Sequence, residues 1–246
     1  MSAFSLKGRT ALVTGANTGI GQAIAVAMAE AGAHVIASGR RDCDETLEMM
    51  GRVSDKAGRS LMLDFADPMA ARDVFADQRI DILVNNAGII RRDDAVDFSE
   101  ADWDAVMDVN LKALFFTCQA FARAALPRGR GKIVNIASLL SFQGGIRVPS
   151  YTASKHGVAG LTKLMANEWA AKGLTVNAIA PGYIETNNTE ALRADPDRSK
   201  AILDRIPAGR WGRPEDIAQT AVFLAAPASD YINGAVLNVD GGWLAR

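Results

Sequence analysis

The 246 residues are enough for one large α/β domain or two small ones, and a composition of 49% hydrophobic and 22% charged residues allows a full core. A formal net charge of −1 supplies no basic surface, which argues against nucleic acid as a partner. Cys43 and Cys118 are too few for a disulfide framework and fit a reducing compartment. The sequence contains no run of ~18 apolar residues, so no membrane span is predicted, and the first residues lack the apolar region of a signal peptide. We therefore expect a cytoplasmic protein with no membrane partner.

The first predicted elements are a short apolar strand over residues 10–14, a glycine-rich loop over 15–21 and an alanine-rich helix to residue 31. This order is typical of a dinucleotide-binding unit, because the free N–H groups at the helix start can bind a pyrophosphate. The glycines follow the spacing G-x-x-x-G-x-G, which allows a tight turn and a close approach of ligand to backbone. The candidate cofactor contacts in this loop are Gly15, Asn17, Thr18, Gly19, Ile20 and Gly21.

The second predicted strand, residues 34–38, ends where such folds contact the adenosine ribose. An acidic residue at that position would repel a 2′-phosphate, but this chain has Gly39-Arg40-Arg41. Two guanidinium groups can grip a phosphate, so the residues lean slightly to NADP, with Arg40 as the candidate contact. Alternatively, the arginines stack on adenine or lie in solvent, and NAD binds.

Residues 61–64 form a third predicted strand, and residues 68–78 a helix that begins at its proline. Asp64 lies at the carboxyl end of that strand, the edge at which sheets of this kind bind ligands. Its carboxylate can accept a hydrogen bond from an adenine amino group. Asp64 and the following Phe65 are therefore candidate cofactor contacts.

A fourth, apolar strand is predicted over residues 82–85, and small or amide side chains follow it. They suit close contact with a flat ligand, or else form an ordinary turn; these candidate contacts are Asn86, Ala87 and Gly88. Ser99 then begins a capping box for a long helix predicted over 100–126. Asn110 lies inside that helix, where it either bonds to backbone or water, or is an exposed amide.

The strongest candidate for chemistry is a tyrosine–lysine pair. Tyr151 and Lys155 are four residues apart in a helix predicted over 150–172, which places both on one face. An ammonium beside a phenol favours the phenolate, and use near neutral pH requires the phenol pKa to fall by roughly 2–3 units. Ser138 follows a strand predicted over 132–136, and its hydroxyl can hold a substrate oxygen while Tyr151 moves the proton. The alternative is a helix start with an exposed tyrosine and a solvated lysine.

The last part of the chain alternates again between strand and helix, with strands predicted over 175–179 and 235–239 and a helix over 214–226. The irregular region 187–212 is too long for a simple connection, so we expect a helical flap over the substrate, or alternatively a surface excursion. Alternation along the whole chain predicts a parallel sheet covered on both faces. We expect a single dinucleotide-binding catalytic domain over residues 1–246.

Several motifs occur in this order and spacing: Thr14-Gly15-x-x-x-Gly19-x-Gly21, Asn85-Asn86-Ala87-Gly88, Ser138, Tyr151-x-x-x-Lys155, and Pro181-Gly182 with Thr186. Together they resemble the short-chain dehydrogenase/reductase family over essentially the whole chain. The resemblance implies a Rossmann-type, doubly wound, seven-stranded parallel sheet with helices on both faces, assembled into homotetramers or dimers. It implies a catalytic tetrad of Asn110, Ser138, Tyr151 and Lys155. It also implies cofactor contacts at Tyr151, Lys155, Pro181, Gly182, Ile184 and Thr186.

A finer resemblance, to dehydrogenases of keto-deoxy sugar acids that usually use NAD, is carried by residues 138–151, 187–189, 206–212 and 240–246. It implies an oxidoreductase that interconverts a secondary alcohol and a ketone on a sugar acid, with NAD or NADP as the cofactor and no metal. Two alternatives stay open. One is a short-chain reductase with another substrate, such as a gluconate 5-dehydrogenase or a 3-oxoacyl reductase. The other is a non-catalytic dinucleotide sensor.

In the implied oxidation, Tyr151 as phenolate takes the hydroxyl proton, while Lys155 lowers the phenol pKa and holds the nicotinamide ribose. Ser138 donates a hydrogen bond to the carbonyl oxygen, and Asn110 positions a water that relays protons.

A sugar acid also carries a carboxylate, which an Arg can bind through two parallel hydrogen bonds. Arg147, in the loop before the tyrosine, is the leading candidate for that contact, and Arg91 and Arg92 come next. The candidate substrate contacts are Ser138, Gln143, Arg147 and Tyr151.

Overall fold

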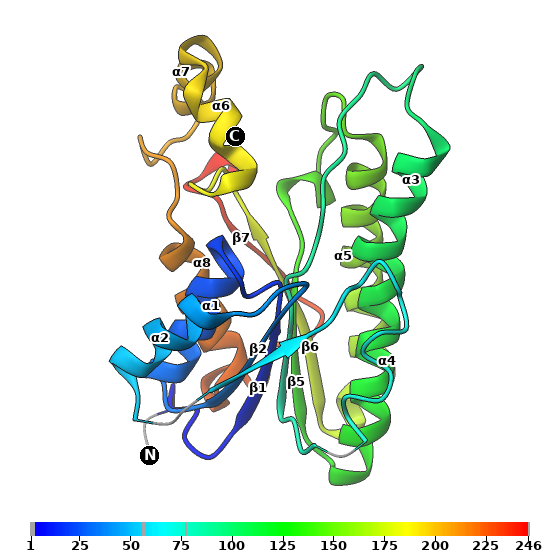
Figure 1. The fold of residues 1–246 in the computed structure, drawn as a ribbon, viewed down its shortest axis with the longest axis vertical. Helices are drawn as coiled ribbons and strands as arrows, with labels where there is room; N and C mark the ends of the chain where they lie inside the picture. The colour runs from blue at the N-terminus through cyan, green and yellow to red at the C-terminus, as the bar shows by residue number, and fades with distance from the viewer. Residues whose placement is uncertain (1–2, 56–57, 77, 246) are drawn as a thin grey trace.

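Seven parallel strands form the centre of the molecule (Figure 1). The computed structural model describes residues 3–55, 58–76 and 78–245, so residues 1–2, 56–57, 77 and 246 lie outside the description. The strands pair in the order β3-β2-β1-β4-β5-β6-β7, and each pair is parallel. They are β1 (Thr10–Thr14), β2 (His34–Gly39), β3 (Arg59–Met62), β4 (Ile82–Asn85), β5 (Gly131–Ile136), β6 (Leu174–Pro181) and β7 (Val236–Val239). The predicted fold class is confirmed.

Helices cover both faces of this sheet, because successive side chains of a strand point to opposite sides. In β1, Ala11 and Val13 pack into one buried cluster and Leu12 packs into another. The layer on the first cluster holds α1 (Gly19–Glu30), α2 (Asp44–Val53) and α8 (Pro214–Ala225). The opposite layer holds α3 (Glu100–Met107), α4 (Ala113–Ala125) and α5 (Pro149–Trp169).

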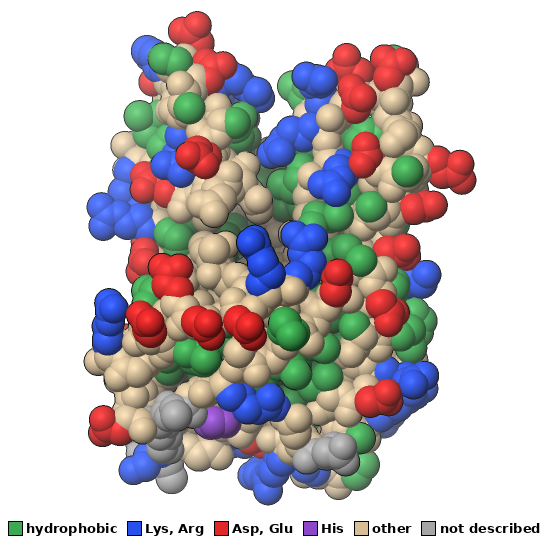
Figure 2. All heavy atoms as spheres, in the orientation of Figure 1, with side chains coloured by type: hydrophobic (Ala, Val, Ile, Leu, Met, Phe, Trp, Pro, Cys, Tyr) green, Lys and Arg blue, Asp and Glu red, His purple; other side chains and the backbone are tan. Residues whose placement is uncertain are grey.

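The winding direction changes between β1 and β4. β1 pairs with both β2 and β4, so the chain winds outward in one direction to β3 and in the other to β7. Ligands of such sheets bind outside the carboxyl ends of the strands at this switch point. Figure 2 shows the surface hollowed between two projecting arms, with Lys and Arg side chains around the hollow.

One arm is the segment 187–212, which contains α6 (Glu190–Ala194) and α7 (Pro196–Leu203) (Figure 1). The helical character predicted for this segment is therefore present. The other arm includes the loop before α3 and the loop before α5. Short 3₁₀ turns occur at Leu126–Arg128, Leu139–Ser141, Ala170–Lys172, Asn187–Thr189, Pro227–Ser229 and Trp243–Ala245.

The helix predicted over residues 68–78 is wrong. Residues 65–76 form consecutive turns instead, with bonds such as Arg72 N–H to the Met69 carbonyl at 2.9 Å. The Asp67 carboxylate accepts the Met69 N–H at 2.9 Å, as a helix N-cap would, but the backbone bonds that follow join residues three apart rather than four, so no α-helix continues from this cap. Buried Phe75 then anchors the segment to the core by packing rather than by helix formation.

Two further elements differ from the prediction. β3 ends at Met62, two residues earlier than expected, which leaves Asp64 in a turn beyond the strand. Helix α2 was not predicted. Its buried positions are Thr46 and Met50, which lie one turn apart, and its other residues contact solvent more. Such a narrow apolar stripe is a weak signal beside the strong glycine and strand patterns around it.

Candidate active site

The four predicted catalytic residues come together at the carboxyl edge of the sheet. Ser138 follows β5, and Tyr151 and Lys155 lie in the first two turns of α5. Asn110 lies in a π-helical turn, Asp108–Lys112, which interrupts the long helix predicted over 100–126 and separates α3 from α4. Helix α5 starts at a proline, where the missing N–H leaves no hydrogen bond unmade.

Lys155 is buried beneath the tyrosine. Its Nζ donates to the Ile136 carbonyl at 2.6 Å and lies 5.5 Å from the centre of the Tyr151 ring. Burial lowers the pKa of Lys155 to about 8. The alternative of a solvated lysine is therefore wrong, and the helical spacing brings the two side chains together as predicted.

The phenol of Tyr151 does not have the lowered pKa that we predicted. Its pKa is raised, because burial penalises the phenolate; a hydrogen bond from the Ser138 side chain and the charge of Arg92 act in the opposite direction. The prediction assigned the lowering to Lys155. The structure places that ammonium over the ring and engages it with a backbone carbonyl. Tyr151 is therefore a neutral phenol near neutral pH.

Asn110 is 1% exposed, so the alternative of an exposed amide is wrong. Its Oδ1 accepts the Ile89 N–H at 2.8 Å, and its Nδ2 donates to the Ile89 carbonyl at 2.9 Å and to Ser154 Oγ at 3.4 Å. A Cβ at Gly88 would lie 3.2 Å from Asn110 Oδ1, so the backbone after β4 runs close to this side chain. The π turn directs the amide to that backbone and to α5.

Ser138 occupies the N-cap position of the 3₁₀ turn that follows β5. Its Oγ accepts the Leu140 N–H at 3.2 Å, and the same side chain hydrogen-bonds the phenol of Tyr151. Ser141 Oγ donates to the Lys155 carbonyl at 2.6 Å, which ties the same turn to α5. These bonds fix the distance between the serine loop and the tyrosine helix.

The glycine loop presents the amino end of α1 to the crevice. Among the described residues, the Thr18 N-cap makes no side-chain cap bond, and the first turn of α1 carries no acidic residue. The first N–H groups and the positive end of the helix are therefore available to an anion. Gly15 and Gly19 have φ of 64° and 60°, and a Cβ at Gly21 would lie 2.2 Å from the Gly15 carbonyl oxygen. The loop thus fits the pyrophosphate of a dinucleotide.

Asn86 and Ala87 hold the glycine loop in place. Asn86 Nδ2 donates to the carbonyls of Thr14 and Gly15, at 3.1 Å and 3.0 Å. The N–H groups of Asn86 and Ala87 both donate to Thr14 Oγ1 at 3.0 Å. The amide of Asn86 is therefore occupied within the protein, and it shapes the cofactor loop from behind.

The two predicted adenine contacts have different surroundings. Asp64 is exposed, and its Oδ1 accepts the Ala66 N–H at 3.0 Å. Phe65 is 6% exposed and packs in the core. A ligand can therefore meet the carboxylate of Asp64, but only the backbone of Phe65.

The remaining predicted cofactor contacts lie at the end of β6 and just after it, next to the glycine loop. Pro181 ends β6, and a Cβ at Gly182 would lie 2.6 Å from Asp240 Cα, so the chain passes close to β7. Ile184 is 3% exposed. A Cβ at Gly19 would lie 3.4 Å from Thr186 Cγ2, which places Thr186 opposite the start of α1.

The arginine that we ranked first for a substrate carboxylate is held by two aspartates. Arg147 Nη2 lies 3.5 Å from Asp93 Oδ1, and its Nε lies 3.0 Å from Asp94 Oδ1. Its φ of 64° is unusual for a residue with a side chain. Arg91 is paired as well, with Asp102 at 3.1 Å.

Arg92 differs from its neighbours. Within the described residues it forms no ion pair, and its Nη2 donates to the Asn188 carbonyl at 3.5 Å across the hollow. Its charge also acts on the phenol of Tyr151. Of the three arginines, Arg92 is therefore the unneutralised cation beside the tyrosine.

Gln143 meets an aromatic group that the sequence analysis did not identify. Trp243 Nε1 donates to Gln143 Oε1 at 3.3 Å, the Tyr183 ring lies 4.7 Å from the Trp243 ring, and the Arg205 guanidinium lies 4.0 Å over it. Because an indole N–H only donates, the bond turns the amide N–H groups of Gln143 away from Trp243. These aromatic residues are far apart in the chain, so no local pattern could reveal the cluster.

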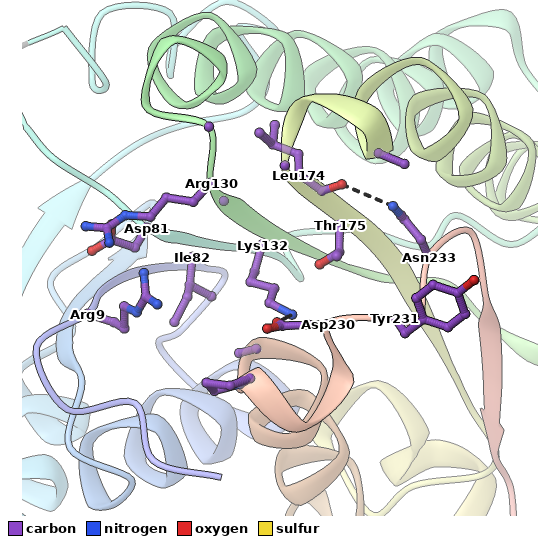
Figure 3. A pocket seen from close by; sticks show the side chains of 16 residues that line it. Arg9, Asp81, Ile82, Arg130, Lys132, Leu174, Thr175, Asp230, Tyr231 and Asn233 are labelled. Carbon is purple, nitrogen blue, oxygen red and sulfur yellow. Dashed lines mark hydrogen bonds and ion pairs between the residues drawn. The ribbon is translucent and has the colours of Figure 1, made fainter. Parts of the chain in front are cut away.

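A cavity of about 490 Å³ lies at the edge of the sheet opposite the predicted catalytic residues, among the amino ends of the strands (Figure 3). Two of its cationic side chains pair with its two carboxylates: Lys132 Nζ lies 2.7 Å from Asp230 Oδ1, and Arg130 Nε lies 3.9 Å from Asp81 Oδ1. A pocket of about 200 Å³ beneath the 187–212 arm includes Gly182 and Ile184. The predicted chemistry lies at this carboxyl edge, so we assign the candidate site there.

Known proteins show which family has this arrangement. Residues 15–244 match a family model described as enoyl-(acyl carrier protein) reductase, of the short-chain alcohol dehydrogenase type. The chain belongs to the short-chain dehydrogenase/reductase family. This membership makes it an NAD(P)-dependent oxidoreductase and confirms the predicted family.

Two relatives within the short-chain dehydrogenase/reductase family match along their whole length. The 2-dehydro-3-deoxy-D-gluconate 5-dehydrogenase of Dickeya dadantii is 55% identical over 252 residues, covering 100% of this chain and 99% of that protein. The enzyme of the same name from Bacillus subtilis is 58% identical over 252 residues, covering 99% and 98%.

Solved structures of the family are also similar over nearly the whole chain. A protein of Agrobacterium tumefaciens, provisionally named a 2-deoxy-D-gluconate 3-dehydrogenase and holding NADP, is 72% identical with a TM-score of 0.98, covering 100% of both chains. A gluconate 5-dehydrogenase of Burkholderia cenocepacia in complex with NADP and tartrate is 40% identical with a TM-score of 0.92, covering 99% of this chain and 98% of that one.

Across residues 3–55, 58–76 and 78–245, no group of His, Cys, Asp and Glu side chains is placed to hold a metal ion. In the same part of the chain, the helices lack the combination of length and apolar character that a membrane crossing requires.

Proposed function

We propose that this chain is a 2-dehydro-3-deoxy-D-gluconate 5-dehydrogenase, an activity also described as 2-deoxy-D-gluconate 3-dehydrogenase. It would interconvert a secondary alcohol and a ketone on a sugar acid with NADP or NAD. The observation that carries the proposal is the full-length similarity to the Dickeya and Bacillus enzymes of that name. The neutral phenol of Tyr151 supports it, together with Arg92, which forms no ion pair within the described part of the chain, because the reaction needs a proton donor and an acid-binding cation.

The proposed mechanism assigns one task to each member of the tetrad. The bound dinucleotide supplies hydride exchange at its nicotinamide. Tyr151 donates its proton to the ketone oxygen, and Ser138 donates a second hydrogen bond to the same oxygen. Lys155 holds the nicotinamide ribose from beneath the tyrosine, and Asn110 positions the backbone of the β4 loop and a water that relays protons.

For the cofactor we favour NADP. The two residues directly after β2, where such folds select the ribose, are the exposed Arg40 and Arg41 rather than an acidic residue. The NADP-bound relatives from Agrobacterium and Burkholderia support this assignment. The glycine loop would hold the pyrophosphate, and Asp64 the adenine.

We propose a single catalytic domain over residues 1–246, with 187–212 as the flap over the substrate. The Arg92–Asn188 contact supports the flap, because it joins the two arms across the hollow. We also propose a cytoplasmic homotetramer. The exposed apolar side chains of Trp103 on α3 and Leu164 on α5 support an interface on that layer. Light scattering should then give four times the 26.1 kDa of one chain, and a monomer mass would refute the tetramer.

The activity is tested by following the absorbance of the reduced nicotinamide with purified enzyme. The panel holds 2-dehydro-3-deoxy-D-gluconate, gluconate and a 3-oxoacyl thioester, each with NADP and NAD. We expect the highest kcat/KM with the keto-deoxy sugar acid. A higher value with gluconate or with the thioester would assign the enzyme to that substrate instead. Absence of turnover with every member would overturn the proposed activity.

Replacement of the phenol tests the proton donor. Tyr151→Phe should lower turnover at least about 100-fold, since general acid catalysis contributes roughly 10²–10⁴-fold. Cofactor affinity, measured by quenching of protein fluorescence, should change little because the ring stays in place. Turnover within a few-fold of the wild type would show that another group carries the proton.

Two arginine variants test the substrate carboxylate. Arg92→Ala should raise KM for the sugar acid about 10- to 100-fold, because charge-assisted hydrogen bonds contribute about 1.5–3 kcal/mol. The matched control is Arg147→Ala, whose side chain is engaged by Asp93 and Asp94 and should matter less. A larger effect of Arg147→Ala than of Arg92→Ala would restore Arg147 as the clamp.

A further inference from the structure

The side chain of Asn17 joins the glycine loop to the arginine-bearing loop after β2. Its Nδ2 donates to the Arg41 carbonyl at 2.7 Å and to the Asp42 carbonyl at 2.8 Å. An amide has two N–H hydrogens, so both of its donors are used on two consecutive residues of one loop. These residues are separated from Asn17 by 24 and 25 positions in the chain, so the contact is tertiary.

The last residue of β2 is shaped to receive this amide. A Cβ at Gly39 would lie 1.6 Å from Asn17 Oδ1, far inside any possible contact. The φ of Gly39 is not positive, so the glycine is required for space and not for backbone conformation. Asn17 therefore lies directly on the strand end from which the arginine loop emerges.

A second set of bonds holds the glycine loop from the other side. The Ala16 N–H donates to the Ser38 carbonyl at 2.8 Å, and Thr46 Oγ1 of α2 donates to the Ala16 carbonyl at 2.7 Å. Gln22 Nε2 donates to the Asn17 carbonyl at 3.3 Å and to Thr46 Oγ1 at 3.2 Å. The backbone of Asn17 is thus fixed, and its side chain transmits that position to the loop after β2.

The clamp holds the backbone of the arginine loop and leaves its side chains free. Arg40 and Arg41 are exposed, and within the described residues neither forms an ion pair or a side-chain hydrogen bond. A guanidinium offers five N–H donors in a planar fork that matches phosphate. A loop with a fixed backbone loses less entropy when its side chains close on an anion.

We propose that Asn17 is a positioning residue for the 2′-phosphate of NADP, acting through the backbone of the Arg40–Arg41 loop. The inference rests on the proposed use of a dinucleotide, but not on the sugar-acid substrate. The proposed role of Asn17 differs from a direct contact with the adenosine. A direct contact would affect NAD and NADP alike, whereas a clamp on the arginine loop affects the phosphorylated ribose.

Calorimetric titration of the ligand-free protein tests the inference without turnover. The probes are adenosine 2′,5′-bisphosphate, which carries the 2′-phosphate, and adenosine 5′-monophosphate, which lacks it. Asn17→Leu keeps the volume and removes both donors, so it should weaken the bisphosphate about 10-fold and the monophosphate less than about 2-fold. Asn17→Ser retains one donor, so its affinity for the bisphosphate should lie between those of the wild type and of Asn17→Leu. If the leucine variant fails to fold, the serine variant provides the same test.

A double-mutant cycle shows whether Asn17 acts through the arginines. In a chain that carries Arg40→Ala and Arg41→Ala, Asn17→Leu should cause no further selective loss of the bisphosphate. The inference would be overturned if Asn17→Leu weakened both probes equally or left the affinity for the bisphosphate unchanged. It would also be overturned if Asn17→Leu still caused the full selective loss in the chain that lacks Arg40 and Arg41. Failure of the wild type to bind either probe would overturn it as well. A failure of sugar-acid turnover alone would refute the proposed substrate and leave the clamp standing.

Discussion

At the scale of single residues, Tyr151 and Lys155 affect each other less than their spacing implies. Burial raises the pKa of the phenol, and burial also lowers the pKa of the ammonium to about 8. The charge that opposes the rise at Tyr151 comes from Arg92, on the loop before α3. The resting site therefore holds a protonated phenol, which suits reduction of a ketone without any prior proton loss.

This protonation state predicts opposite pH dependences in the two directions. Oxidation needs the phenolate, whose fraction grows with pH below a raised pKa, so kcat for oxidation should rise between about pH 6 and about pH 9. Reduction needs the phenol and should stay level near neutral pH before it declines. Initial rates in both directions at constant ionic strength measure this. A plateau of the oxidation rate within this range would contradict the raised pKa of Tyr151, because the phenolate would then already be fully formed.

At the scale of elements, the approach of α1 to β1 fixes the cofactor loop. A Cβ at Gly21 would meet the Gly15 carbonyl oxygen at 2.2 Å and Asn86 Nδ2 at 2.4 Å. Helix α2 covers the same face of the sheet, but its Gly51 is exposed, and among the described residues no atom lies within 4 Å of a Cβ built there. Glycine is thus required at position 21 of α1 and merely tolerated at position 51 of α2.

These two glycines form a matched pair of stability probes. Gly51→Ala should raise the free energy of unfolding by about 0.5–1 kcal/mol, because alanine favours the helix at no steric cost. Gly21→Ala should lower it by about 1–3 kcal/mol through overpacking. Urea unfolding at one protein concentration measures both. A Gly21→Ala variant as stable as the wild type would show that α1 can move away from β1.

At the scale of the whole molecule, both layers are closed around the sheet. Cys43 is 2% exposed in the layer of α1, and Cys118 is 0% exposed in the layer of α4. Burial raises the pKa of both thiols, to about 12 for Cys118. Each layer therefore contains one protected thiol that can react only when that layer opens.

The two thiols should report the opening of the layers. In native buffer a disulfide-exchange reagent should modify neither cysteine at an appreciable rate, whereas both should react in denaturant. Cys43→Ser leaves Cys118 as the only thiol, so any reaction of that variant is assigned to the layer of α4. Rapid reaction of one thiol in the native protein would show that its layer opens locally rather than with the whole fold.

The sequence by itself determined the strands and most of the helices, in their order along the chain. Apolar runs such as residues 82–85, the glycines at 15–21 and the spacing of Tyr151 and Lys155 are local signals, because strand, tight turn and helix face each depend on neighbours in the chain. They were sufficient for the seven-stranded parallel sheet and for the motifs of the family. Local signals failed in two segments whose backbone conformation depends on tertiary packing: the turns of 65–76 and the π turn at Asp108–Lys112.

The tertiary structure alone decided what surrounds each side chain. The pairing of Arg147 with Asp93 and Asp94, the raised pKa of Tyr151 and the bonds of Asn17 to the loop after β2 all involve residues far apart in the chain. Burial and Coulomb interactions depend on distance in space, and sequence spacing carries little information about that distance. For this reason the sequence could name the residues of the site, while only the fold established which charges they meet.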